Sequence, residues 1–155
     1  MKKFRLQSIL EYRRSLEEEI QLEFAQSQTL LAREMELSSK IQHQIDIWQQ
    51  RLQKKQHEAG SIFDSSYPVQ IDLLQKFLQF LTAEAKRQAE KVRSLELAAD
   101  KKRQALLEAR QERKVMERLK EKTLALWERE MLQEEQKILD ERAISQYRGV
   151  LDEEG

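Results

Sequence analysis

The residues of this chain that could do chemistry are two histidines and a large set of carboxylates. His43 and His57 stand fourteen residues apart in charged surroundings. No carboxylate pattern converges with them on the three or four ligands that a metal site needs. Adjacent carboxylates such as Asp140 and Glu141 would point in different directions on a helix. The sequence therefore predicts surface histidines and solvated carboxylates.

Other chemistry is excluded by residue types. Gly60, Gly149 and Gly155 are too far apart to form a glycine-rich phosphate loop. The chain has no cysteine, so it can form neither a disulfide nor a thiolate metal site. Catalysis also needs a concave pocket. We therefore expect no cofactor and no metal, and we predict that the protein is not an enzyme.

The composition indicates which elements position these side chains. Charged residues make up 36% of the 155 residues and apolar residues 39%, with three glycines and one proline. This balance is typical of long helices rather than of a globule. A narrow helix–helix seam, meaning the positions that face a partner helix, needs about two apolar residues in seven. We predict an all-α fold with one coiled-coil domain over residues 1–155.

Net charge and hydropathy limit the kinds of partner that the chain can have. The chain carries equal numbers of acidic and basic residues, which argues against nucleic-acid binding despite a basic bias over residues 84–122. No apolar run approaches the ~20 residues of a membrane span, and Lys2 and Lys3 are not followed by the apolar stretch of a signal peptide. We expect a cytoplasmic protein that reaches a membrane only through its partners.

One segment interrupts the helical pattern, and it divides the chain into two helices. Gly60 follows several cations, as at a helix C-terminus. Asp64, Ser65 and Ser66 offer N-capping oxygens, and Pro68 suits the first turn of a helix. The pattern predicts a first helix over about 3–58, a tip over about 59–68, a second helix over about 69–148 and an acidic tail over 149–155, with a stop at Gly149.

Apolar spacing predicts the seam of each helix. In the second helix, steps of three and four residues meet an apolar side chain at eleven of fourteen positions. These positions are Ile71, Leu74, Leu78, Leu81, Ala85, Gln88, Val92, Leu95, Ala99, Lys102, Leu106, Ala109, Arg113 and Met116. The first helix is less regular, with Leu16, Ile20, Phe24, Leu31, Met35, Ile41, Ile45, Trp48 and Leu52.

A short tip between two such helices predicts an antiparallel hairpin. Folding about the tip places residue i opposite about residue 128 − i. Gln88 then falls opposite Lys40, and Trp48 meets Phe80 and Leu81. The neighbouring Phe77 is expected to be exposed on the flank.

The same register leaves a C-terminal helical overhang. Phe4 pairs near Leu124, so residues from about 126 to 148 have no partner within the chain, and their seam positions turn polar. Trp127, at the base of this overhang, is expected to contact another molecule or to pack along the stem. An isolated polar helix of this length is marginal in water, so the overhang is predicted to be a strut or a segment that another protein holds.

Three stretches of the chain carry a resemblance to a known family. They are Phe4-Arg-Leu-Gln-Ser-Ile-Leu-Glu-Tyr-Arg-Arg-Ser-Leu-Glu, Met116-Glu-Arg-Leu-Lys-Glu-Lys-Thr and Glu134-Glu-Gln-Lys-Ile-Leu-Asp-Glu-Arg-Ala. In type and order they resemble the two ends of FliJ, a coiled-coil component of the flagellar type III export apparatus. The resemblance implies a stalk-like antiparallel hairpin.

The resemblance also implies partners and binding residues. The terminal end would enter the hexameric flagellar export ATPase and promote its assembly and activity, and the protein would associate with the export gate and with export chaperones at the inner membrane of the flagellar base. The ATPase-binding residues would be Phe4, Leu6, Arg13, Trp127, Glu134, Gln136, Lys137, Ile138, Asp140 and Glu141. The gate-binding residues, nearer the tip, would be Ile47, Phe77 and Leu81.

Two other functions remain open from the residues alone. One is the equivalent stalk protein of a virulence-type injectisome. The other is a generic self-associating structural coiled coil, which would keep its C-terminal seam apolar so that a second copy could cover it; here the seam turns polar.

Overall fold

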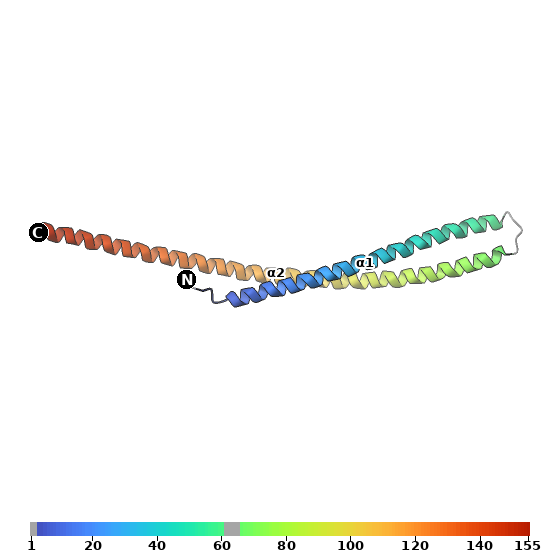
Figure 1. Ribbon diagram of the computed structural model, residues 1–155, viewed down its shortest axis with the longest axis horizontal. Coiled ribbons are helices and arrows are strands. Elements are labelled where there is room, and N and C mark those ends of the chain that lie inside the picture. The colour runs from blue at the N-terminus through green and yellow to red at the C-terminus, as the bar shows by residue number, and fades with distance from the viewer. Residues whose placement is uncertain (1–2, 61–65) are drawn as a thin grey trace. The chain divides into compact units, whose positions relative to one another are not determined.

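The computed structural model describes residues 3–60 and 66–155, and these form two long helices. Helix α1 spans Gln7–Ala59 and helix α2 spans Tyr67–Glu154. The two pack against each other in antiparallel directions, and the described residues include no strand (Figure 1). The predicted all-α helical hairpin is confirmed.

The helix ends near the tip agree with the sequence. Helix α1 ends at Ala59, one residue before Gly60. At the start of α2, the carbonyl oxygen of Ser66 accepts a hydrogen bond from the Gln70 N–H at 3.2 Å. Pro68 lies in this first turn, where a backbone N–H would have no acceptor within the helix, so the N–H that proline lacks is not needed. The predicted capping residues Asp64 and Ser65 lie outside the described residues.

The two outer helix ends differ from the prediction. Helix α1 begins at Gln7, whereas a start near residue 3 was expected. Helix α2 passes through Gly149 and ends at Glu154, so the predicted stop and the non-helical tail are wrong. A glycine costs an exposed helix only about 1 kcal/mol relative to alanine. Here Gly149 does not adopt a positive φ, and Val150 and Leu151 continue the helix.

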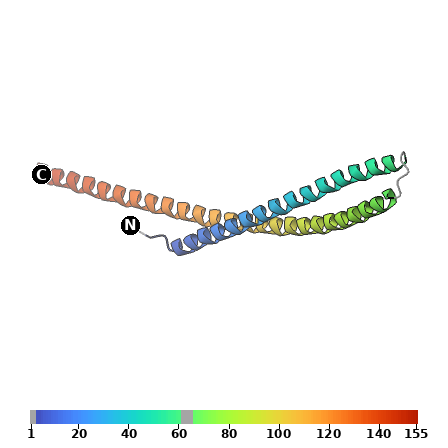
Figure 2. The same ribbon diagram turned by 45° about the vertical axis from the view of Figure 1, so that its right-hand side comes forward.

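The chain divides into two compact units. The first consists of Met1–Glu18 and Glu108–Gly155, and the second of Glu19–Leu107. In the second unit, α1 and α2 lie side by side in both views (Figures 1 and 2), and the buried apolar residues include Ile45, Ala99 and Leu106. In the first unit, the paired part is centred on Leu10 and Ala109, of which Leu10 is fully buried.

The seam of α2 is confirmed at all fourteen predicted positions, each of which is buried or half-buried. The seam of α1 differs at one place. Met35 is 45% exposed, and Glu34 takes the seam position at 6%. Glu17 and Ser27 are also buried. Buried polar groups are stable when they are hydrogen-bonded, and no buried side-chain nitrogen or oxygen of the described residues lacks a partner.

The predicted register is close to the observed one, but two of its contacts are wrong. Polar contacts across the interface join residues whose numbers sum to between 122, for Glu34 with Gln88, and 131, for Arg14 with Glu117. Gln88 therefore reaches Glu34 and not Lys40. The same shift brings Trp48 to Phe77, at 5.1 Å between ring centroids.

Candidate functional site

The first unit contains two adjoining grooves that share Lys3, Phe4 and Trp127; together we call them the terminal groove. Their volumes are about 710 and 890 Å³. The smaller is completed by Arg5, Leu6, Leu119 and Thr123, and the larger by Gln7, Lys120, Leu124, Glu128 and Met131. The segment before α1 thus lies along α2 and forms a partly apolar hollow with it.

Three of the predicted ATPase-binding residues meet at this groove. Phe4, Leu6 and Trp127 are all half-buried and line it together. Trp127 therefore packs along the stem, one of its two predicted positions. Because the segment that carries Phe4 and Leu6 precedes the first turn of α1, the backbone there can follow the surface of α2. Lys3 and Lys120 add positive charge at the rim.

Beyond the groove, residues 128–155 of the chain form an extension in which every side chain is exposed. In both views no second helix lies beside this orange-to-red part of α2 (Figures 1 and 2). The predicted overhang therefore exists, and it starts at the groove and reaches Glu154. Apolar side chains on it are about half exposed or more: Met131, Leu132, Ile138, Leu139, Ile144, Tyr147, Val150 and Leu151.

The remaining predicted residues of the terminal end lie along this extension on more than one face. Glu134, Lys137 and Glu141 follow the three–four spacing of the seam, so they share one face. Gln136 and Asp140 occupy another face, where the Gln136 amide donates a hydrogen bond to Asp140 at 2.9 Å. The structure does not gather these residues into one patch. Together they cover roughly half of the helix circumference, so a partner that contacts all of them wraps around that half.

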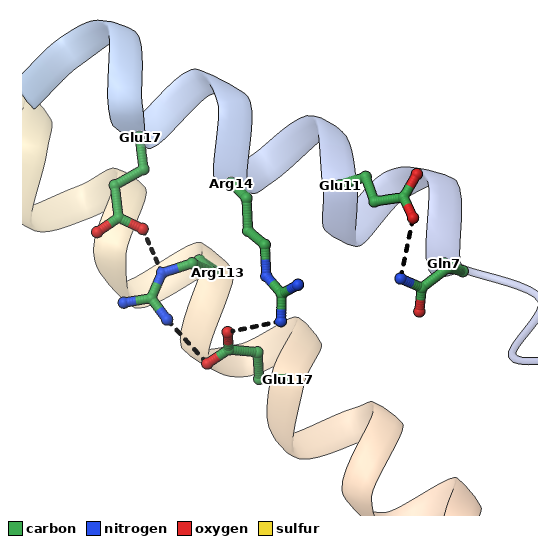
Figure 3. Close-up of polar contacts among 6 residues, drawn as sticks. All are labelled: Gln7, Glu11, Arg14, Glu17, Arg113 and Glu117. Carbon is green, nitrogen blue, oxygen red and sulfur yellow. Dashed lines mark hydrogen bonds and ion pairs between the residues drawn. The ribbon is translucent and has the colours of Figure 1, made fainter.

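Arg13 belongs to an ionic cluster of the first unit and not to the groove. It pairs with Glu112, while Arg14 donates to Glu117 at 3.3 Å. Arg113 pairs with the buried Glu17 and reaches Glu117 at 2.8 Å, so one guanidinium joins two carboxylates (Figure 3).

The cluster shifts the pKa values of its members. The hydrogen bond from Arg113 lowers the pKa of Glu117, and the hydrogen bond to Glu17 raises the pKa of Arg113. Both shifts favour the charged forms, since each charged group is bonded to its opposite. We assign this cluster to helix pairing.

The second unit carries an exposed apolar surface near the tip. Val69, Leu73, Phe77 and Phe80 follow three–four spacing on α2, and we call them the apolar stripe. Val69 and Leu73 are more than 60% exposed, and Phe80 is 55% exposed. Phe77 is 39% exposed because its ring packs in a T-shaped arrangement with Trp48, and it also stacks against Phe80 at 6.5 Å.

The predicted gate-binding residues lie only partly on the apolar stripe. Phe77 belongs to the stripe, whereas Leu81 is a half-buried seam residue and Ile47 is half-buried on α1. Val69, Leu73 and Phe80 were not predicted. Their spacing beside the seam of α2 could have revealed them, because apolar residues that repeat along a second face are not needed for helix pairing.

The described residues contain no group of three or more side chains able to hold a metal ion. His43 is exposed on α1. No helix in the part of the chain that the structure describes is long and apolar enough to cross a membrane. The candidate sites are two surfaces, namely the terminal groove with its extension and the apolar stripe.

Comparison with known proteins identifies the family. The family model described as "Flagellar FliJ protein" matches residues 1–151. No curated protein and no solved structure matches the chain. The match includes both helices and almost all of the extension, and the family is a non-enzymatic one related to flagellar export. The chain belongs to the flagellar FliJ protein family.

Proposed function

We propose that this protein is the stalk of the flagellar type III export ATPase, with the extension and the terminal groove inserted into the ATPase hexamer. The observation that supports this best is the exposed extension, which continues α2 beyond its pairing with α1. Its candidate residues cover roughly half of the helix circumference, which would let more than one subunit of a ring contact them. Membership in the FliJ family supplies the export context.

The two parts of this end have different roles in binding. Phe4, Trp127 and Ile138 offer apolar area, and such anchors usually supply most of the affinity of an interface. Glu134, Lys137 and Glu141 are exposed charges, which mainly steer and orient a partner. In the functional cycle, the protein promotes assembly and activity of the ATPase without hydrolysing ATP itself.

Stimulation of ATP hydrolysis tests this proposal. The purified flagellar export ATPase is assayed with the full chain and with a chain that ends at Met131, which keeps the groove and removes most of the extension. We expect stimulation to be lost. Equal stimulation by the two chains would contradict the stalk assignment. Ile138→Ala should weaken stimulation, and Leu97→Ala, an exposed leucine of the second unit, is its matched control.

Salt dependence separates the two contributions. Because exposed charges are screened over about 10 Å at 0.1 M salt, added salt should weaken the stimulation by the full chain. The stimulation of ATP hydrolysis that remains at high salt should depend on Trp127. If Trp127→Ala behaves like the full chain at every salt concentration, the groove does not take part.

We further propose that the apolar stripe binds the export gate. Exposed, contiguous apolar side chains usually mark a binding surface, and the stripe lies near the tip, away from the residues assigned to the ATPase along the chain. Leu73→Ala should weaken binding to the cytoplasmic region of the gate, while Leu97→Ala, which removes an equally exposed leucine, should not. Equal loss in both variants would contradict this assignment.

Association with export chaperones and a cytoplasmic position beside the inner membrane complete the proposal. Both depend on family membership, and contact with the membrane would be made through the gate and the ATPase. Co-purification of the ATPase and the gate with the tagged full chain from flagellated cells tests this arrangement. Recovery of neither partner would contradict it.

A further inference from the structure

Two of the polar layers that interrupt the apolar seam between the helices contain a buried glutamate. Among the charged residues that the structure describes, only Glu17 and Glu34 are buried, at 9% and 6% exposure. Both lie on α1 at seam positions where a leucine would otherwise fit. Buried ion pairs often contribute little net stability, and their best-attested role is to select one pairing geometry.

Each buried glutamate meets matched partners on α2. The Gln88 amide donates both to the Glu34 carboxylate at 2.6 Å and to the Glu34 carbonyl oxygen at 3.0 Å. Lys91 lies 3.1 Å from the same carboxylate. Glu17 pairs with Arg113 and lies 3.4 Å from Arg110. All these donors come from the facing helix.

The sequence of α2 shows what these glutamates would meet if the helices slipped by one heptad, the smallest slip that keeps the seams facing each other. The residue seven positions before Gln88 is Leu81, and the residue seven positions after it is Leu95. A slipped Glu34 would therefore lose Gln88 in both directions and face leucine. Leaving a buried carboxylate without donors is strongly unfavourable.

The layer at Glu17 discriminates less sharply, because Glu17 has two cations on α2, Arg110 and Arg113. A slip toward lower numbers of α2 replaces Arg113 with Leu106 but Arg110 with Arg103. A slip toward higher numbers replaces Arg113 with Lys120 but Arg110 with Glu117. Glu17 therefore keeps one cation in either slip, and Glu34 with Gln88 is the layer that excludes both slips.

We propose that Glu34, through Gln88 and Lys91, specifies the register of the hairpin, and that Glu17 with Arg113 is a weaker second layer. The apolar seam alone repeats every heptad and does not distinguish the slipped pairings. The register has a structural consequence in the first unit. A slip of one heptad would move Phe4 about two turns along α2, away from Trp127, and would dismantle the terminal groove.

Spin-label distances measure the register directly. The chain has no cysteine, so labels can be placed at Glu23 and Lys86, which are both exposed in the second unit. Lys86 lies about four turns of α2 from the point opposite Glu23. A heptad slip moves one helix along the other by about 10 Å, so it lengthens or shortens the measured distance according to its direction.

Leucine replacement of the polar layers is the test. The unsubstituted labelled chain should give one distance peak. E34L/Q88L should add a second peak, displaced by up to about 10 Å, because Glu17 keeps one cation in either slip. E17L/R113L/E34L/Q88L should populate both longer and shorter distances. Circular dichroism confirms that each variant remains helical.

The matched control adds four leucines without changing the seam. E36L/K40L/D100L/R103L removes two exposed ion pairs and should keep the single original peak. A single unshifted peak in the four-leucine seam variant would overturn the proposal. If that variant precipitates, E34L/Q88L decides by itself, and a single unshifted peak in E34L/Q88L overturns the proposal.

Discussion

At the scale of single residues, charge is placed where it can be paired across the two helices. Glu34 and Glu17 are buried in the seam, and Arg113 joins Glu17 to Glu117. Exposed pairs such as Glu36 with Lys40 contribute little, commonly 0.2–1 kcal/mol. Glu34 and Glu117, whose pKa values are lowered by these contacts, should therefore contribute most to the response of this protein to pH.

Stability should fall in acid. Hydrogen bonds from Gln88 and then Lys91 lower the pKa of Glu34 below 4.5, and the hydrogen bond from Arg113 lowers that of Glu117. A carboxyl group whose pKa is lower in the folded state stabilises the fold above its unfolded pKa, and this stabilisation is lost as the pH falls through the folded value. Thermal unfolding should therefore shift little between pH 7 and 5.5 and move to lower temperature below pH 4.5.

Glu34→Gln provides the control for this pH dependence. Its melting temperature should fall less between pH 7 and pH 3 than that of the unsubstituted chain, because one titrating carboxyl group is missing. An equal fall in both proteins would show that Glu34 does not contribute.

Phe77 should contribute to stability as well as to binding. Its ring packs edge-on against Trp48 at 5.1 Å, and such pairs are worth about 0.5–1.5 kcal/mol beyond the area that they bury. Phe77→Ala should lower the free energy of unfolding by about 1–2 kcal/mol. Val69→Ala, on the same stripe but 63% exposed, should stay within about 0.5 kcal/mol. Urea titration of the two variants measures the difference, and equal values would show that the ring contact is not formed in solution.

At the scale of elements, the two helices differ in what they need from each other. Helix α1 is paired with α2 from its first turn at Gln7, whereas α2 continues past this pairing, through the extension, to Glu154. The extension lacks the support of tertiary packing, so its helicity depends on intrinsic propensity and on side-chain pairs such as Gln136 with Asp140. Single substitutions there should change local order and leave the paired helices unchanged.

Gly149→Ala should strengthen the end of α2. Gly149 is helical, and a Cβ atom added to it would meet no atom within 4 Å. The gain in local helix stability should be up to about 1 kcal/mol. Hydrogen exchange of the amides near residue 149 should slow several-fold, while the thermal unfolding of the hairpin stays unchanged. Unchanged exchange would show that the helix has already frayed before Gly149.

At the scale of the whole molecule, one chain supplies both helices of the pair. Folding is then unimolecular, and the melting temperature should not depend on protein concentration between about 5 and 200 µM. Light scattering should report a mass near the 18.6 kDa of one chain. A melting temperature that rises with concentration, together with twice this mass, would instead show that two chains pair. Along the extension, the positions that continue the seam of α2 are polar, namely Glu130, Glu134, Lys137 and Glu141.

The sequence by itself determined the secondary structure and the face of each helix that is buried. The composition excludes a globular core, one glycine–proline segment marks the tip, and the three–four spacing predicted every seam position of α2. These features are local, so propensity and periodicity were sufficient. The end of α2 was mispredicted because Gly149 is a weak helix breaker without a left-handed backbone.

Only the tertiary structure decided which polar residues enter the seam and which aromatic rings meet. A shift of a few residues in register replaces Lys40 with Glu34 as the neighbour of Gln88, and Phe80 with Phe77 as the neighbour of Trp48. Apolar periodicity assigned the seam to Met35 because it counts a glutamate as exposed. Burial of Glu34 depends on donors supplied by the facing helix, more than fifty residues away in the sequence, and no local pattern contains that information.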